Sequence, residues 1–350
     1  MGHMDEHLLD PRLIRAPEFA PGAWLNTDSP LTRERLRGQV VLVDFWDYTC
    51  VNCIRTLPYV TSWNDRYADR GLVVVGVHAP EFRFARARPQ IEAAVAEHGI
   101  GYPVLLDNDY QTWDRYAVKA WPTKALIDPD GYVRYVRQGE GGYAETERAI
   151  QALLRERDPA VELPRIMPPL RAEDAPGAVC YRTTPELYAG YQRGSLGNPQ
   201  GYAAGSPVVY ELPLQRDEPF LYAAGIWRAG PESLAFAGQD GGQIVLPYHA
   251  AGVNAVLSPS ADPVEVALNL RPADVDPLVE VWQDGAPLTP VNAGADIIYE
   301  DGGISGVLVE RPRMYELVRN PEYGAHELAL VFRANALALY AFTFNSCITS

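Results

Sequence analysis

The sequence has little cysteine, almost no lysine and no long apolar run. Four of its 350 residues are cysteine, too few for a disulfide-stapled scaffold. Its formal net charge of −15 argues against nucleic-acid binding, because phosphate contacts need a basic surface. No run of about 18 apolar residues occurs, so we expect no membrane span in this chain. These absences favour a soluble protein with about half of its residues apolar and available for packed cores.

The N-terminal residues show no signal peptide. Residues 1–15 begin with "MGHMDEHLLD", in which "GHM" is typical of a cloning remnant. We therefore treat these residues as a tag and tail outside the fold. If Met4 is the natural start, the expected compartment is the cytoplasm.

Strand and helix patterns alternate through residues 16–156, the first predicted domain. A continuous apolar run is typical of a strand buried on both faces, and Gly or a "PDG" turn ends several elements. Strands are expected at 39–46, 72–78 and 102–107, helices at 51–70, 88–99 and 111–118, a hairpin at 123–128 and 132–138, and a closing helix at 143–157. This order predicts a mixed α/β sheet.

A change of composition separates a second domain. Residues 157–176 form a proline-rich stretch without periodicity, which predicts a linker. Beyond it, residues 177–350 show short alternating runs with frequent turn signals, typical of an all-β jelly-roll sandwich. Ten strands are expected, at 208–214, 220–229, 233–238, 242–249, 252–258, 264–270, 278–285, 306–318, 326–332 and 338–344.

A Cys-x-x-C pair, Cys50 and Cys53, lies where the first long strand passes into a helix. No second pair or His-x-x-x-His accompanies it, so we expect no metal site. At the helix N-terminus Cys50 would meet free amides and the helix dipole, which predicts a pKa lowered from about 8.5 toward the range of about 3.5–7.5. Cys50 would then attack a disulfide, and Cys53, one turn later, would resolve the mixed disulfide. This couple is the only redox group expected, with no separate cofactor.

Three further residues fit a redox site. Asp44 is a carboxylate inside a buried strand, where proton transfer with Cys53 is its natural task. Pro58 lies within the helix and is expected to kink it. Pro122, in "AWPTKALI", precedes a strand, and a cis bond there would expose backbone to an extended substrate peptide.

Together these residues resemble the thioredoxin superfamily over about residues 16–155. The long gap from Cys53 to Pro122 resembles the TlpA-like, cytochrome c biogenesis branch, in which a glutamate after the next strand lies near the active site; Glu81 matches it. The stretches "LRGQVVLVDFWDYTCVNC", "GVHAPEF", "WPTKALID", "TPELYAGYQRG" and "YAFTF" are similar to the soluble part of the DipZ family. Thr49 stands where thioredoxins have tryptophan, and Val51-Asn52 replaces Gly-Pro.

The resemblance implies a protein thiol–disulfide oxidoreductase acting on protein thiol or disulfide clients. Trp121, a cis Pro122 and Thr123 would contact the substrate, and Glu81 would supply a further acid or base. The family joins these domains to a membrane electron-transfer domain, which implies a thiol reductase of that type as electron donor and an extracytoplasmic location. Its second domain is carbohydrate-binding-module-like, which implies client or glycan recognition.

Several alternatives stay open at this point. The β-sandwich could carry a binding or scaffold function, with the redox fold secondary; a peroxiredoxin is disfavoured because that class lacks this C-x-x-C. Asp44 could be a structural acid and Glu81 a solvated loop charge. His78 is expected to be an interior histidine. Lys119 and Lys124 could raise the local potential near the thiolate, although the favoured interpretation is that both are surface charges. Cys180 and Cys347 could form a disulfide or remain two buried thiols.

Overall fold

The structure is a computed structural model that describes residues 8–268 and 277–348. The chain forms two compact units, Met1–Ala175 and Pro176–Ser350. Each unit is described by itself.

The first unit alternates strands and helices, as predicted. Its strands are β1 (Ala23–Leu25), β2 (Val40–Trp46), β3 (Leu72–His78), β4 (Val104–Leu106), β5 (Thr123–Ile127) and β6 (Val133–Gln138). Its helices are α1 (Val51–Tyr67), α2 (Arg88–Glu97), α3 (Gln111–Arg115) and α4 (Tyr143–Arg157), with 3-10 turns η1 (Ala68–Arg70), η2 (Arg83–Arg86) and η3 (Ala172–Asp174). Gly71, with φ 97°, ends the α1–η1 segment, because a left-handed residue there costs glycine little.

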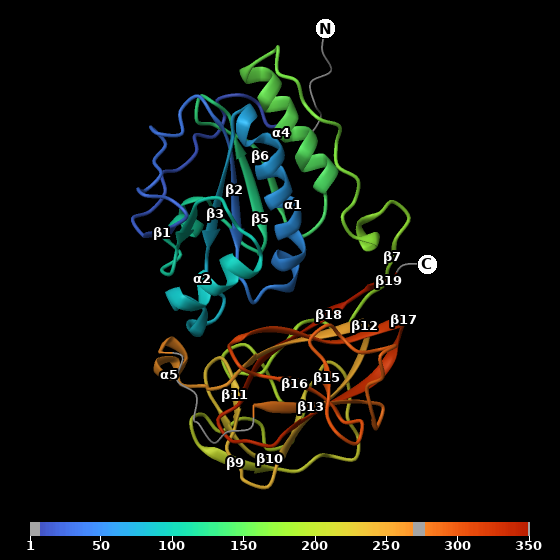
Figure 1. The fold of residues 1–350 in the computed structure, drawn as a ribbon. Coiled ribbons are helices and arrows are strands. Elements are labelled where there is room, and N and C mark those ends of the chain that lie inside the picture. The colour runs from blue at the N-terminus through green and yellow to red at the C-terminus, as the bar shows by residue number, and fades with distance from the viewer. Residues whose placement is uncertain (1–7, 269–276, 349–350) are drawn as a thin grey trace. The chain divides into compact units, whose positions relative to one another are not determined.

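The six strands form one sheet in the order β1-β4-β3-β2-β5-β6. β2 is central, parallel to β3 and antiparallel to β5, and all seven of its residues are buried. Helices α1 and α4 lie across one face of the sheet (Figure 1). Because side chains alternate along a strand, Phe45 packs in the core of the opposite face and Asp44 points toward α1.

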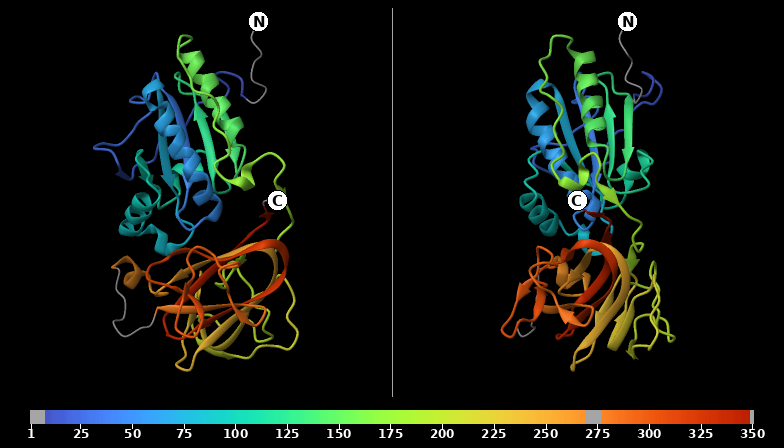
Figure 2. Two further views of the ribbon diagram at one scale, coloured as in Figure 1. Left: turned by 45° about the vertical axis from the view of Figure 1, so that its right-hand side comes forward. Right: turned by 90° about the vertical axis from the view of Figure 1, so that its right-hand side faces the viewer.

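The predicted linker is not a free tether in the residues that belong to the first unit. The segment 158–175 runs back beside α4 and α1 (Figure 2). Pro164 O accepts a hydrogen bond from the Gln151 amide at 2.7 Å, and the Tyr59 hydroxyl accepts from the Leu170 N–H at 2.7 Å. These polar anchors on the two helices hold a segment that has no periodicity of its own.

The second unit is almost entirely β-structure. Its strands are β7 (Val179–Cys180), β8 (Leu187–Tyr188), β9 (Pro207–Tyr210), β10 (Tyr222–Ala229), β11 (Leu234–Phe236), β12 (Gly242–Ser258), β13 (Leu278–Gln283), β14 (Ala286–Pro287), β15 (Ile298–Tyr299), β16 (Ser305–Leu308), β17 (Arg313–Phe332), β18 (Ala338–Asn345) and β19 (Cys347–Ile348). One short helix, α5 (Pro263–Ala267), follows β12.

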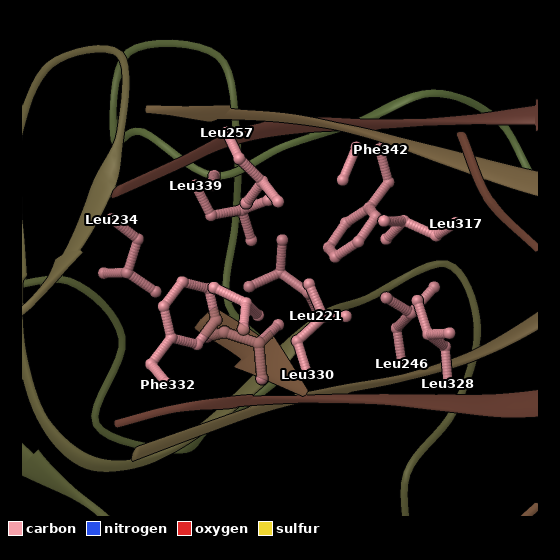
Figure 3. Packing of buried hydrophobic residues seen from close by; sticks show 14 of the residues in the cluster. Leu221, Leu234, Leu246, Leu257, Leu317, Leu328, Leu330, Phe332, Leu339 and Phe342 are labelled. Carbon is pink, nitrogen blue, oxygen red and sulfur yellow. The ribbon is translucent and has the colours of Figure 1, made fainter. Parts of the chain in front are cut away.

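Eleven of these strands belong to one sheet, and β7 and β19 pair separately. The long strands β12 and β17 pair along most of their length, and β12 also pairs with β10 near its start and with β18 near its end. The sheet therefore returns on itself and encloses a core of leucine, valine and aromatic side chains (Figure 3). This confirms an all-β unit; the jelly-roll sandwich itself is not confirmed.

Several details of the strand prediction were wrong. The strand expected at 306–318 is divided: β16 ends at Leu308, and β17 begins at Arg313 and continues through the strand expected at 326–332. The strand expected at 264–270 is helical through Ala267, because the Asp262 carboxylate accepts from the Val264 and Glu265 N–H groups and caps a helix with Pro263 in its first turn; residues 269 and 270 lie outside the described residues. The strands expected at 242–249 and 252–258 are one strand, β12, which continues through a register shift near Gly252. Within residues 8–268 and 277–348, no helix has the length and apolarity that a membrane crossing requires.

Candidate functional site

The two cysteines lie at the carboxyl end of β2, where α1 begins. Cys50 is the N-cap residue of α1, and its Sγ accepts a hydrogen bond from the Cys53 N–H at 3.2 Å. Both cysteines are free thiols; Cys50 is partly exposed and Cys53 is buried. Cys50 is therefore the more exposed cysteine of the pair, and Cys53 lies one helical turn further along α1.

The acidity expected for Cys50 was wrong in direction. Burial raises the pKa of Cys50 above its ordinary value, the Cys53 hydrogen bonds lower it, and the negative charges of Glu81 and Asp47 raise it further. The pKa of Cys53 is raised well above its ordinary value, first by burial. Cys50 lies at the helix N-terminus, as predicted. The prediction of a lowered pKa failed because the thiol is buried and because the charged side chains near it are acidic. Cys50 still has the less perturbed thiol of the two.

Asp44 is buried on the same side of the sheet as Cys53. Its side chain is 1% exposed, and neither carboxylate oxygen has a hydrogen-bond partner among the residues that the structure describes. Burial raises the pKa of Asp44 to about 6, while the charge of Lys124 opposes this rise. The charge of Asp44 in turn raises the pKa of Cys53. A carboxyl group that titrates near neutral pH beside a thiol is suited to exchanging its proton.

Lys124 lies in the site, so the favoured prediction of a surface charge was wrong for this residue. It is 0% exposed, and its Cα is paired with that of Asp44 across β2 and β5. Its Nζ donates to Gly139 O at 3.3 Å, and burial lowers its pKa while the charges of Asp44 and Cys53 raise it. The signal that could have located Lys124 is its position in a short run, "TKALI", that reads as a buried strand. Its pairing with the buried Asp44 becomes visible only in the sheet register.

The predicted substrate-contacting residues lie at the start of β5, beside the end of β2. The peptide bond between Trp121 and Pro122 is cis, as expected. Thr123 pairs with Phe45, and the Trp121 indole donates to Ala79 O at 3.0 Å. The segment 121–123 is thus tied to β2 and to the residue that follows β3.

Glu81 follows β3 and is half-buried. Its charge raises the pKa of Cys50, so it lies within electrostatic reach of the thiol. Its backbone N–H donates to Asp47 Oδ2 at 3.2 Å. The resemblance located this residue near the cysteines, and its half-buried position is inconsistent with a fully solvated loop charge.

Asp47 and His78 form a buried pair that the sequence analysis did not assign. Both side chains are 0% exposed, and His78 Nε2 lies 2.9 Å from Asp47 Oδ1. The Thr49 hydroxyl donates to Asp47 Oδ2. His78 is an interior histidine, as expected, but its acidic partner could not be inferred from spacing because 31 residues separate the two.

In the second unit, Cys180 and Cys347 form a disulfide that joins β7 to β19. Cys180 is exposed, so these residues are not buried thiols. In the described part of the chain, no group of three or more His, Cys, Asp or Glu side chains is placed to hold a metal ion.

Comparison with known families places both units. The AhpC/TSA family matches residues 15–136, and the family described as "Thioredoxin like C-terminal domain" matches residues 184–345. Protein DipZ of Mycobacterium bovis is 38% identical over 237 residues, which cover 67% of this chain and 33% of that protein. The chain therefore spans about a third of the length of the DipZ proteins it matches.

Two shorter relatives match the first unit. Thiol-disulfide oxidoreductase ResA of Bacillus subtilis is 32% identical over 104 residues, 30% of this chain and 55% of that protein. Thiol-disulfide oxidoreductase YkuV of the same organism is 32% identical over 135 residues, 38% of this chain and 89% of that protein. On this likeness to nearly the whole of YkuV, the chain belongs to the thioredoxin-like thiol–disulfide oxidoreductase family.

Proposed function

We propose that the chain exchanges thiols and disulfides with protein clients through the Cys50–Cys53 couple. The observation that carries this proposal is the partly exposed residue Cys50 at the start of α1, with the buried Cys53 one turn behind it. The names of the relatives, two of them thiol-disulfide oxidoreductases, support the same chemistry.

In the reducing direction, the Cys50 thiolate attacks one sulfur of a client disulfide. The client S–S bond breaks, a Cys50–client disulfide forms, and the departing client sulfur takes up a proton. Cys53 then loses its proton and attacks Cys50 Sγ, which releases the second client thiol and leaves a Cys50–Cys53 disulfide. Two electrons pass from the dithiol to the client, and a dithiol donor must return them; we propose a membrane thiol reductase for that role.

Asp44 receives the Cys53 proton in this scheme. A carboxyl group with a pKa of about 6 is largely ionised at neutral pH and is close to the strength at which proton transfer is efficient in both directions. Lys124 faces it from β5 and stabilises the ionised form. Glu81 is a second acid on the Cys50 side.

Trp121, Pro122 and Thr123 are the proposed client contacts in the first unit, because they lie at the start of β5, beside the end of β2 that leads to the cysteines. For the second unit we propose a jelly-roll-like sandwich that recognises a client protein or a glycan. An extracytoplasmic location agrees with the Cys180–Cys347 disulfide, because such bonds persist in oxidising compartments.

Trapping the mixed disulfide tests the central proposal. Cys53→Ser should accumulate a covalent adduct with a disulfide-bonded client, because the resolving thiol is lost, whereas Cys50→Ser should form none. The wild-type chain should also reduce insulin in the presence of a dithiol. Absence of both the adduct and insulin reduction would refute the assignment.

The role of the second unit is tested by cutting the chain between Ala175 and Pro176. This cut keeps the segment 158–175 with the helices that hold it. If the first unit alone reduces a small disulfide normally but handles a protein client poorly, the second unit recognises clients. If the second unit binds client or glycan while the dithiol contributes nothing to that function, the alternative of a binding protein is the better description.

A further inference from the structure

The inference concerns the turn that joins β6 to α4, and it rests on the proposed function. Residues 139–142 of this turn are Gly-Glu-Gly-Gly, and the three glycines have positive φ angles of 80°, 84° and 62°. Glycine adopts this left-handed backbone at little cost, but it has no side chain that could hold the turn in place. Glu140 is therefore the residue of the turn whose side chain can anchor it.

The turn contacts the buried lysine of the site through Gly139. The Gly139 carbonyl oxygen accepts a hydrogen bond from Lys124 Nζ at 3.3 Å, and the Gly139 N–H donates to Pro122 O at 2.7 Å. The carbonyl belongs to the planar peptide unit that ends at the Cα of Glu140. Its direction therefore depends on where Glu140 is held.

Two arginines hold the Glu140 carboxylate. Oε1 lies 2.6 Å from Nη2 of Arg171 in the segment 158–175, and Oε2 lies 3.4 Å from Nη1 of Arg55 on the cysteine helix α1. The three side chains are 22–26% exposed, so water screens these ion pairs less than it screens pairs on an open surface. The carboxylate is thus anchored to α1 and to the segment 158–175.

The Arg171 anchor is itself fixed. Arg171 Nε and Nη2 donate to the Asp174 carboxylate at 2.8 and 2.6 Å, and Asp174 Oδ2 accepts from the Tyr59 hydroxyl of α1 at 2.7 Å. The Tyr59 ring stacks on Tyr143, the first residue of α4, with centroids 3.6 Å apart. A connected network of ion pairs, hydrogen bonds and ring contacts therefore surrounds Glu140.

We propose that Glu140 is a positioning residue that acts on Asp44 through the buried Lys124. Its anchored carboxylate fixes the direction of the Gly139 carbonyl, and that carbonyl holds the Lys124 ammonium opposite Asp44. The ammonium in turn favours the ionised Asp44 carboxylate, which the proposed mechanism needs in order to take the Cys53 proton.

Glu140 also supports the Lys124 ammonium by its charge. Burial lowers the pKa of Lys124, whereas the charges of Asp44 and Cys53 raise it. Arg137 in β6 lowers this pKa further, and Glu140 raises it. Both effects of Glu140, the held carbonyl and the negative charge, therefore favour the ammonium over the neutral amine.

The groups that face Asp44 give the sign of the expected effect. They are Lys124 from β5, Cys53 from α1 and Tyr102 from the residues before β4. Burial raises the pKa of Asp44, and Lys124 is the cation that opposes this rise. Weakening the Lys124 ammonium should therefore raise the pKa of Asp44 further, and the step that needs the ionised carboxylate should move to higher pH.

The test compares Glu140→Gln with the matched control Glu156→Gln in the full chain. Glu156 also pairs with an arginine, Arg134, through contacts of 2.8 and 3.1 Å, but it lies near the opposite end of α4 from the turn. Loss of an ion pair is thus common to both variants, and only Glu140→Gln changes the turn.

Two readouts are followed from pH 4 to 9. The first is the carboxyl-carbon NMR signal of Asp44. In the second, reduced protein is mixed with a small aromatic disulfide, and formation of the Cys50–Cys53 disulfide is measured after acid quenching. Urea unfolding of each protein is recorded in parallel.

In the wild-type chain the Asp44 signal should titrate with a midpoint of about 6. Glu140→Gln should move this midpoint and the pH profile of disulfide formation upward by about half a pH unit, which is about threefold in the ionisation constant. Glu156→Gln should move neither. A lower stability of Glu140→Gln with both midpoints unchanged would assign Glu140 a structural role and overturn the proposal.

A second variant covers the case in which Glu140→Gln does not fold. Arg171→Lys keeps the positive charge but loses the guanidinium that contacts Glu140 and Asp174 together. It should move the Asp44 midpoint in the same direction by a smaller amount, and an unchanged midpoint would overturn the proposal. If the midpoint moves while the wild-type chain forms no Cys50–Cys53 disulfide, the proposed function has failed and the effect of Glu140 on Asp44 stands.

Discussion

Replacing Asp44 with asparagine should stabilise the protein while it slows dithiol turnover. Asp44 is almost fully buried without a hydrogen-bond partner among the described residues, and its pKa in the fold is about 6 against an ordinary value of 3.8. The folded state therefore holds the Asp44 proton more tightly than the unfolded state does. Ionising the group costs folding free energy, and an amide of the same shape does not ionise.

The size of the effect follows from the two pKa values. Their difference corresponds to about 3 kcal/mol, present in full above the folded pKa of about 6. The cost falls to about 1.5 kcal/mol at pH 5 and to about 0.5 kcal/mol at pH 4, because the proton returns to both states there. Asp44→Asn should therefore raise the free energy of unfolding by about 2–3 kcal/mol at pH 8, with the gain lost as pH falls from 6 to 4.

Urea unfolding at pH 8, 6 and 4 measures this, followed by tryptophan fluorescence. Five of the seven tryptophans lie in the first unit, so the signal reports mainly on the unit that contains Asp44. Asp128→Asn is the control of opposite sign, because the Asp128 carboxylate accepts from the Tyr132 N–H at 2.9 Å and lies 3.6 Å from Arg134. A gain that is absent at pH 8, or that persists at pH 4, would refute the reasoning. Unchanged turnover across pH would reduce Asp44 to a structural residue.

Lys124→Met should raise the pKa of Asp44 above about 6 and move the pH profile of dithiol turnover to higher pH. An unchanged profile would show that Lys124 and Asp44 are not coupled. Tyr59→Phe should cost the first unit about 1–2 kcal/mol in urea unfolding, because the lost hydroxyl donates to Asp174 at 2.7 Å and accepts a backbone N–H; a stability equal to wild type would mean that water replaces it. Joint Cys180→Ser and Cys347→Ser substitution should lower the stability of the second unit by about 5 kcal/mol, for a closed loop with a sequence separation of 167. Calorimetry checks this, and a loss confined to the first unit would contradict it.

The order of strands and helices in the first unit could be predicted from the sequence because each element has a local signal in its own residues. Six of the seven buried residues of β2 are apolar, the exception being Asp44. Gly71 marks the end of the helical segment. The cysteine pair, the acid and the proline before β5 were likewise visible as types at fixed spacing. Local chemistry and the global fold agree at these positions, which is what makes such a pattern readable.

The electrostatic environment of Cys50 could not be read in the same way. It depends on burial and on the charges of Glu81 and Asp47. Glu81 reaches the site from the loop after β3 and has no spacing relation to the cysteines. Helix position alone predicted a lowered pKa, whereas burial and two nearby acids decide the actual direction. In the second unit, Asp262 caps the helix that follows it. This capping signal was overlooked because the residues after Asp262 alternate between apolar and polar, which is typical of a strand.

The disulfide between Cys180 and Cys347 also has a mechanical consequence. The two residues enclose nearly all of the second unit, so a pulling force applied to the chain before Cys180 and after Cys347 would pass through the S–S bond. The strands between them would carry none of the load while the bond is intact. Once the bond is reduced, the same force could unravel the enclosed chain by up to about 550 Å, at about 3.3 Å per residue. The extensibility of this unit is thus set by the redox state of its surroundings.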